Sequence, residues 1–208
     1  VEDYQAYLAL LREWCGYWKV EIWAYCLMPN HVHLIAVPTS EDGLRRAIGE
    51  AHRRYTRRVN LREGWRGHLW QGRFASCPLD EPHMLAAARY IEQNPVRAGL
   101  ARTPWDYPWS SAAAHVAGMD DGCVTVAPLL AQVGDWEDFL STPVTEGQVR
   151  ELRRHERSGD APADLSRFTL QAWFSADAVL QKGVDQPAGV DGFTISLAAG
   201  ATLEAEAS

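Results

Sequence analysis

The spacing of apolar residues near the start of the chain changes once, from helical to strand-like. From residues 4 to 15 they recur every three or four positions, which predicts an amphipathic helix ending near Gly16. In residues 19–27 almost every position is apolar, which predicts a strand buried on both faces. Strict alternation along that strand puts Trp23 and Ala24 on opposite faces.

A second apolar run, residues 31–38, follows a Met-Pro-Asn turn and predicts an antiparallel hairpin with the first strand. Because side chains alternate along a strand, His31 and His33 share one face, where a single metal ion can reach both. A buried imidazole needs a polar partner. The pair therefore indicates either a shared metal ion or paired hydrogen bonds within the core.

Residues 41–61 carry apolar side chains at helical spacing and a flank that is almost entirely arginine. The flank consists of Arg45, Arg46, Arg53, Arg54, Arg57 and Arg58. Residues 44–73 contain nine arginines against two glutamates, a local charge of +7, although the chain has a formal net charge of −7. Such a flank favours binding of phosphate oxygens, and the alternative is a solvated charged face.

The rest of the chain divides into three predicted regions: a core over 1–101, a mostly helical extension over 102–159 and an acidic tail over 160–208 with no assigned role. Within them we expect a strand in 69–77, a helix from Asp80 that ends or bends at Asn94, and a last helix over 146–157. The proline- and aromatic-rich residues 104–111 are typical of a packed connector.

Composition narrows the class of protein. The chain is 47% hydrophobic and 23% charged, as in ordinary globular proteins. It has no apolar run long enough for a membrane span and no signal peptide, which predicts a cytoplasmic protein that does not bind membranes. The four cysteines are scattered without a Cys-x-x-Cys pair, so buried thiols are expected rather than a zinc knuckle or disulfides.

Tyr90 and Asn94 are four residues apart, so on one helix they share a face. An amide oxygen there can join two imidazoles as the third ligand of a metal ion, with the tyrosine beside it. The alternatives are a half-buried aromatic for Tyr90 and a helix N-cap for Asn94.

Three runs occur in order: Pro-Asn-His-Val-His at 29–33, Trp-Gln-Gly-Arg-Phe at 70–74 and Tyr-Ile-Glu-Gln-Asn-Pro-Val-Arg-Ala-Gly at 90–99. Together they closely resemble the single-tyrosine HUH transposases, specifically the REP-associated tyrosine transposases of bacteria. The resemblance covers residues 3–158. It implies an α+β, ferredoxin-like antiparallel sheet with helices packed on it, and metal-dependent nicking and joining of single-stranded DNA at palindromic hairpins.

By match of position, the resemblance implies His31, His33 and Asn94 as metal ligands and Tyr90 as the nucleophile that forms a 5′-phosphotyrosine link. It implies Mg²⁺ or Mn²⁺, and two imidazoles suit Mn²⁺ better. Further candidate DNA contacts are the arginine flank, Trp70, Arg73 and Arg97. Trp65 or Trp70 can stack on unpaired bases, and the alternative for both is a place in the core. The oligomeric state stays open.

Members of this family begin with a strand that precedes the first helix, and this chain starts directly at the helix. We therefore expect a missing interior strand and an unpaired edge on the histidine strand. A catalytically inactive hairpin-binding remnant is the alternative function. A His-x-His hydrolase on a barrel is disfavoured, because that fold needs about 250 residues and repeated βα units.

Overall fold

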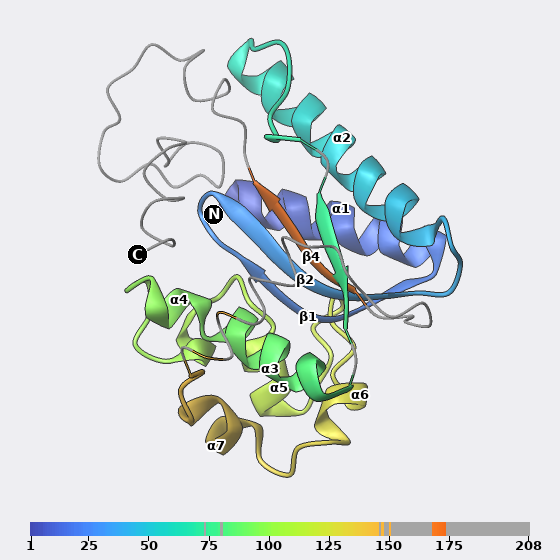
Figure 1. Cartoon of the computed structure of the whole chain (residues 1–208). Helices are drawn as coiled ribbons and strands as arrows, with labels where there is room; N and C mark the ends of the chain where they lie inside the picture. The colour runs from blue at the N-terminus through green and yellow to red at the C-terminus, as the bar shows by residue number, and fades with distance from the viewer. Residues whose placement is uncertain (73, 80, 146, 148–149, 151–167, 174–208) are drawn as a thin grey trace.

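The computed structural model describes residues 1–72, 74–79, 81–145, 147, 150 and 168–173 (Figure 1). Arg73, Asp80 and most of the helix expected over 146–157 lie outside these described residues.

The N-terminal half follows the predicted periodicity. Helix α1 spans Glu2–Trp18 and ends at Lys19, which adopts the left-handed conformation (φ 55°), so it runs past Gly16. Strands β1 (Val20–Leu27) and β2 (His31–Pro38) form the expected antiparallel hairpin. Their backbone-to-backbone pairing runs from Val20 opposite Pro38 to Leu27 opposite Val32.

A register shift in β1 between Ile22 and Ala24 corrects the predicted alternation. An extra residue in one strand of a pair puts successive side chains on the same face. Trp23 and Ala24 consequently pack in the same core cluster, whereas Ile22 and Tyr25 pack in the other.

The sheet has four antiparallel strands in the order β1-β2-β4-β3, with β3 at Ala75–Pro78 and β4 at Phe168–Trp173. Strand β4 comes from the region to which the sequence assigned no element, and it pairs with β2 on one side and β3 on the other (Figure 1). It occupies the interior place expected to be empty. The predicted unpaired edge of the histidine strand is therefore wrong: β2 has a partner on both sides.

Helices cover both faces of the sheet (Figure 1). Helix α1 and helix α2 (Gly43–Glu63) lie together on one face, and α2 ends at Gly64, whose positive φ of 70° suits glycine. Their apolar stripes meet one face of the hairpin in the first core cluster, whose most buried members include Tyr7, Leu11, Leu34, Ile48, Tyr55 and Leu69.

The other face carries the shorter helices. These are α3 (Glu81–Glu92), α4 (Asn94–Arg97), the 3-10 helix η1 (Pro104–Asp106), α5 (Ala112–Ala117), α6 (Ala127–Leu130) and α7 (Trp136–Ser141). The second core cluster lies here and includes Ala24, Ile35, Met84, Ile91, Leu129 and Trp136. The architecture confirms the predicted α+β class with helices packed on an antiparallel sheet.

Two further features concern the described part of the chain. None of its helices has the length and apolar character needed to cross a membrane. Cys15 and Cys26 are buried free thiols, and Cys123 is a partly buried one.

Candidate metal and tyrosine site

The two histidines of β2 form a buried pair on the face of the sheet that α3 covers. His31 is 1% exposed and His33 is fully buried, and their Nε2 atoms lie 2.9 Å apart with the rings perpendicular. Asn30, at the start of the strand, accepts a hydrogen bond from His31 Nδ1 through its Oδ1 at 2.5 Å. This bond places the proton of neutral His31 on Nδ1 and leaves the Nε2 lone pair directed at the centre of the pair.

The surroundings keep His31 neutral. Burial, then the neighbouring His33, then the positive charge of Arg97 hold the pKa of His31 well below its usual range. A neutral imidazole is the form that binds metal ions.

Asn94 comes to the same place from the junction of α3 and α4. The residue is 3% exposed, its Nδ2 lies 3.5 Å from His31 Nε2, and its Oδ1 accepts from Arg97 Nη2 at 2.9 Å. The N-cap of α4 is Gln93, so the predicted capping role of Asn94 is wrong. Ligation through Oδ1 would exchange the Arg97 contact for the metal ion.

Tyr90 completes the group from the last turn of α3. Its ring meets the His33 ring edge to face, with centroids 5.8 Å apart, and is 5% exposed as a residue. The guanidinium carbon of Arg97 lies 3.9 Å from the centre of the Tyr90 ring. The structure thus brings together Tyr90, His31, His33 and Asn94, with Arg97 beside them.

The donor set consists of imidazoles and an amide rather than acidic groups. Among the described residues no cluster of three or more His, Cys, Asp and Glu side chains could hold a metal ion. Any metal ion at this place would therefore rely on the amide of Asn94 or on solvent as a further ligand.

The arginine flank lies elsewhere. All six arginines are exposed on α2, which packs with α1 on the opposite face of the sheet from the histidine pair (Figure 1). Several are engaged by nearby acids: Arg45 and Arg46 by Asp42, and Arg53 and Arg54 by Glu50. These ion pairs reduce the positive field that the sequence predicts for this flank.

Trp70 is placed in the core rather than at a DNA-facing surface. It is 7% exposed, its ring stacks on His52 at 3.8 Å, and its Nε1 donates to the His52 carbonyl. These contacts favour the core alternative for Trp70 over base stacking. Trp65 is partly buried against the same core cluster.

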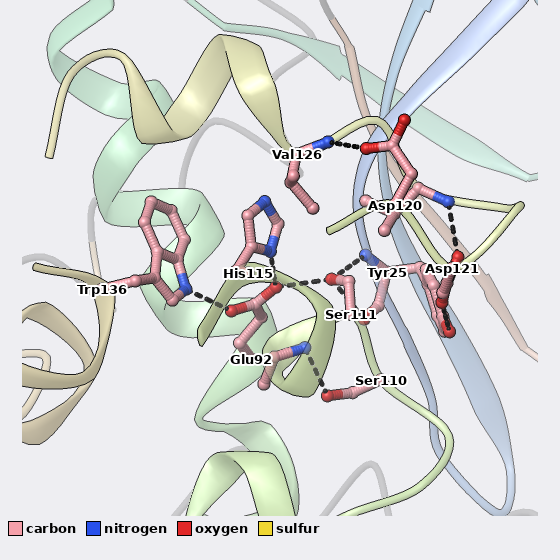
Figure 2. Close-up of polar contacts among 11 residues, drawn as sticks. Tyr25, Glu92, Ser110, Ser111, His115, Asp120, Asp121, Val126 and Trp136 are labelled. Atoms are coloured by element: carbon pink, nitrogen blue, oxygen red, sulfur yellow. Dashed lines mark hydrogen bonds and ion pairs between the residues drawn. The ribbon is translucent and has the colours of Figure 1, made fainter. Parts of the chain in front are cut away.

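His52 and Glu92 are two buried polar groups that the sequence did not single out. His52 bonds the Tyr7 hydroxyl at 2.8 Å, and burial lowers its pKa to about 3. Glu92 is a fully buried side chain between Tyr90 and Asn94 in the sequence, hydrogen-bonded to Ser111, His115 and Trp136 (Figure 2). The sequence offered one signal for Glu92, its position between the candidate site residues Tyr90 and Asn94. It could not show the partners of Glu92, because they lie far along the chain.

Comparison with known proteins bears on this arrangement. Residues 2–94 match the family model described as "Transposase IS200 like". This region is therefore similar to the IS200-like transposases. The IS200-like region ends at Asn94 and so includes both histidines and Tyr90, and the family suggested by the sequence motifs is confirmed.

The chain is also similar to a putative REP-associated tyrosine transposase of Haemophilus influenzae, with 26% identity over 111 residues. The matched part covers 48% of this chain and 63% of that relative, so the chain spans less than two thirds of the relative's length. No solved structure matches the chain significantly.

Proposed function

We propose that this chain cleaves and rejoins single-stranded DNA at palindromic hairpins, with Tyr90 as the nucleophile and a divalent metal ion held by His31, His33 and Asn94. The observation that carries the proposal is the convergence of these side chains in one buried group, beside Arg97. The supporting context is the IS200-like region that contains all four residues. A DNA substrate places this action in the cytoplasm.

The residues present suit a divalent ion. His31 is held neutral, its Nδ1 is committed to Asn30, and its Nε2 faces His33 Nε2 at 2.9 Å. Imidazole nitrogen is a softer ligand than Mg²⁺ prefers, so we expect Mn²⁺ to bind more tightly. When bound, the ion supplies neutralisation of charge on a phosphate oxygen and orientation of the phosphate for in-line attack.

Tyr90 performs the covalent step. Its phenolic oxygen attacks phosphorus, the bond from phosphorus to the 3′-oxygen breaks, and the phenol proton passes through solvent to that departing oxygen. The products are a 5′-phosphotyrosine and a free 3′-hydroxyl. Because water is not consumed, attack by a 3′-hydroxyl reverses the step, rejoins DNA and restores Tyr90.

Arg97 contributes charge at the same place. Its guanidinium lies over the Tyr90 ring and donates to Asn94, which leaves further N–H donors for an anion. A planar guanidinium suits phosphate oxygens, so Arg97 would hold the scissile phosphate against the phenol. The exposed arginines of α2, with Arg73, are proposed contacts for the more distant DNA backbone.

The experiment uses a library of single-stranded hairpins with randomised flanks, labelled at the 3′ end. A 5′-phosphotyrosine link leaves the 3′ label on the protein, so denaturing gels should show a labelled protein band that requires Mn²⁺. The band should disappear with chelator and in Tyr90→Phe. Hairpin binding without any such band would instead favour a non-catalytic hairpin-binding protein.

A further inference from the structure

Two buried side chains at the junction of α3 and α4 are hydrogen-bonded to other elements of the fold. Glu92 and Gln93 lie between Tyr90 and Asn94 in the sequence, and both are buried, at 0% and 8% exposure. Glu92 is two residues from both Tyr90 and Asn94, so its side chain points to another side of the helix, and the Gln93 amide is hydrogen-bonded to the segment after α7. Their contacts are therefore separate from the candidate site.

Glu92 connects this junction to three other elements (Figure 2). Its Oε1 accepts from Ser111 Oγ at 2.5 Å and from His115 Nδ1 at 2.7 Å, and its Oε2 accepts from Trp136 Nε1 at 2.9 Å. Ser111 Oγ in turn accepts from the backbone N–H of Tyr25 in β1 at 2.9 Å. One carboxylate thus joins α3, α5, α7 and the sheet.

Gln93 adds a second connection to the segment after α7. Its Nε2 donates to the carbonyls of Leu140 and Thr142 at 2.6 and 2.9 Å, and its Oε1 accepts from the N–H of Val144 at 3.2 Å. Both polar atoms of this side chain are hydrogen-bonded to one backbone segment.

Such a network contributes more to geometry than to stability. Removing a carboxylate from water is costly, and apolar residues of similar volume often stabilise a core as well or better. A carboxylate with three hydrogen-bond partners on other elements fixes one arrangement, because any rotation of the helix breaks several bonds at once. Here the arrangement being fixed is the direction in which Tyr90 and Asn94 point.

We propose that Glu92 and Gln93 are positioning residues, which lock the rotation of the α3–α4 junction so that Tyr90 and Asn94 face the histidine pair. The catalytic part of this inference rests on the proposed function. The helical segment over residues 110–144 is then a support for the nucleophile.

The test compares Glu92→Gln with Tyr7→Phe as a matched control. The first replaces one acceptor oxygen by a donor that opposes the N–H of Trp136, while the second removes a buried hydrogen bond to His52 on the opposite face of the sheet. Single-turnover cleavage at saturating hairpin and Mn²⁺ should fall at least tenfold in Glu92→Gln, with hairpin affinity within twofold of the parent. Tyr7→Phe should keep both within twofold.

A readout independent of activity uses 3-fluorotyrosine at position 90 and its ¹⁹F spectrum. Glu92→Gln should shift or split the resonance, whereas Tyr7→Phe should leave it unchanged. If Glu92→Gln does not fold by circular dichroism, Gln93→Met, which keeps the length of the side chain without its polar atoms, makes the same comparison. An unchanged ¹⁹F spectrum in Glu92→Gln overturns the positioning role, whether or not the parent protein cleaves DNA. If the parent cleaves DNA, equal cleavage rates in Glu92→Gln and Tyr7→Phe also overturn it.

Discussion

Asn30 controls the metal affinity of the site through His31. Replacing Asn30 by alanine removes the acceptor that lies 2.5 Å from His31 Nδ1. The neutral ring can then carry its proton on either nitrogen, and a proton on Nε2 blocks ligation. Loss of such an outer partner typically costs 10–100-fold in metal affinity, which corresponds to about 1.4–2.7 kcal/mol. We therefore expect Asn30→Ala to weaken Mn²⁺ binding by one to two orders of magnitude.

The assay is a Mn²⁺ titration in which electron paramagnetic resonance measures the free hexa-aqua ion. Asn30→Asp is the matched control, because it keeps an acceptor at the same place and should bind Mn²⁺ at least as tightly as the parent. His31→Ala should abolish binding. If Asn30→Ala binds Mn²⁺ within twofold of the parent while His31→Ala does not bind, the reasoning about the tautomer is refuted.

Three further predictions concern acid stability, the sheet and the choice of metal ion. Burial lowers the pKa of His52 to about 3, whereas an unfolded histidine has a pKa of about 6.5. Between these two values only the unfolded chain binds a proton at His52, so the free energy of unfolding falls as the pH is lowered. The expected loss is about 2 kcal/mol between pH 7 and pH 5. In urea unfolding, His52→Gln should lose about 2 kcal/mol less than the parent over that range, and equal losses would argue against a buried neutral His52. Leu170→Pro removes a backbone hydrogen-bond donor from the interior strand β4. The melting temperature should therefore drop, and Mn²⁺ binding by the adjacent histidine strand should weaken. An unchanged melting temperature and Mn²⁺ affinity would show that β4 is dispensable. Adduct formation should reach half-maximum at a lower concentration of Mn²⁺ than of Mg²⁺, and the reverse order would count against two imidazole ligands.

Local patterns were sufficient for the elements that form from neighbouring residues. The hairpin of β1 and β2, helix α2 and the end of α3 before Asn94 follow from periodicity, a turn and a proline. The bulge in β1 was missed because an extra residue leaves no mark in an uninterrupted apolar run. Strand β4 was missed because its pairing with β2 joins residues more than 130 positions apart, which no local pattern records.

The candidate site shows the same division. Period-2 geometry placed His31 and His33 together, as the structure has them. Helical spacing placed Tyr90 and Asn94 on one helix face, whereas the structure has Tyr90 in α3 and Asn94 at the start of α4, both beside the histidines. Whether an aromatic such as Trp70 lies in the core depends on tertiary packing, so spacing alone left it open. The partners of Glu92 lie 19, 23 and 44 residues away along the chain, so its buried network was invisible in the sequence.

The most direct test of the central claim is mass spectrometry of the covalent product. The protein is incubated with the hairpin library and Mn²⁺, then digested with protease and nuclease, and the peptide that retains a nucleotide is sequenced. The account predicts a 5′-phosphonucleotide on the phenolic oxygen of Tyr90, absent when His31 and His33 are replaced together by alanine. An adduct on another residue, or one that forms equally well without the two histidines, would contradict it.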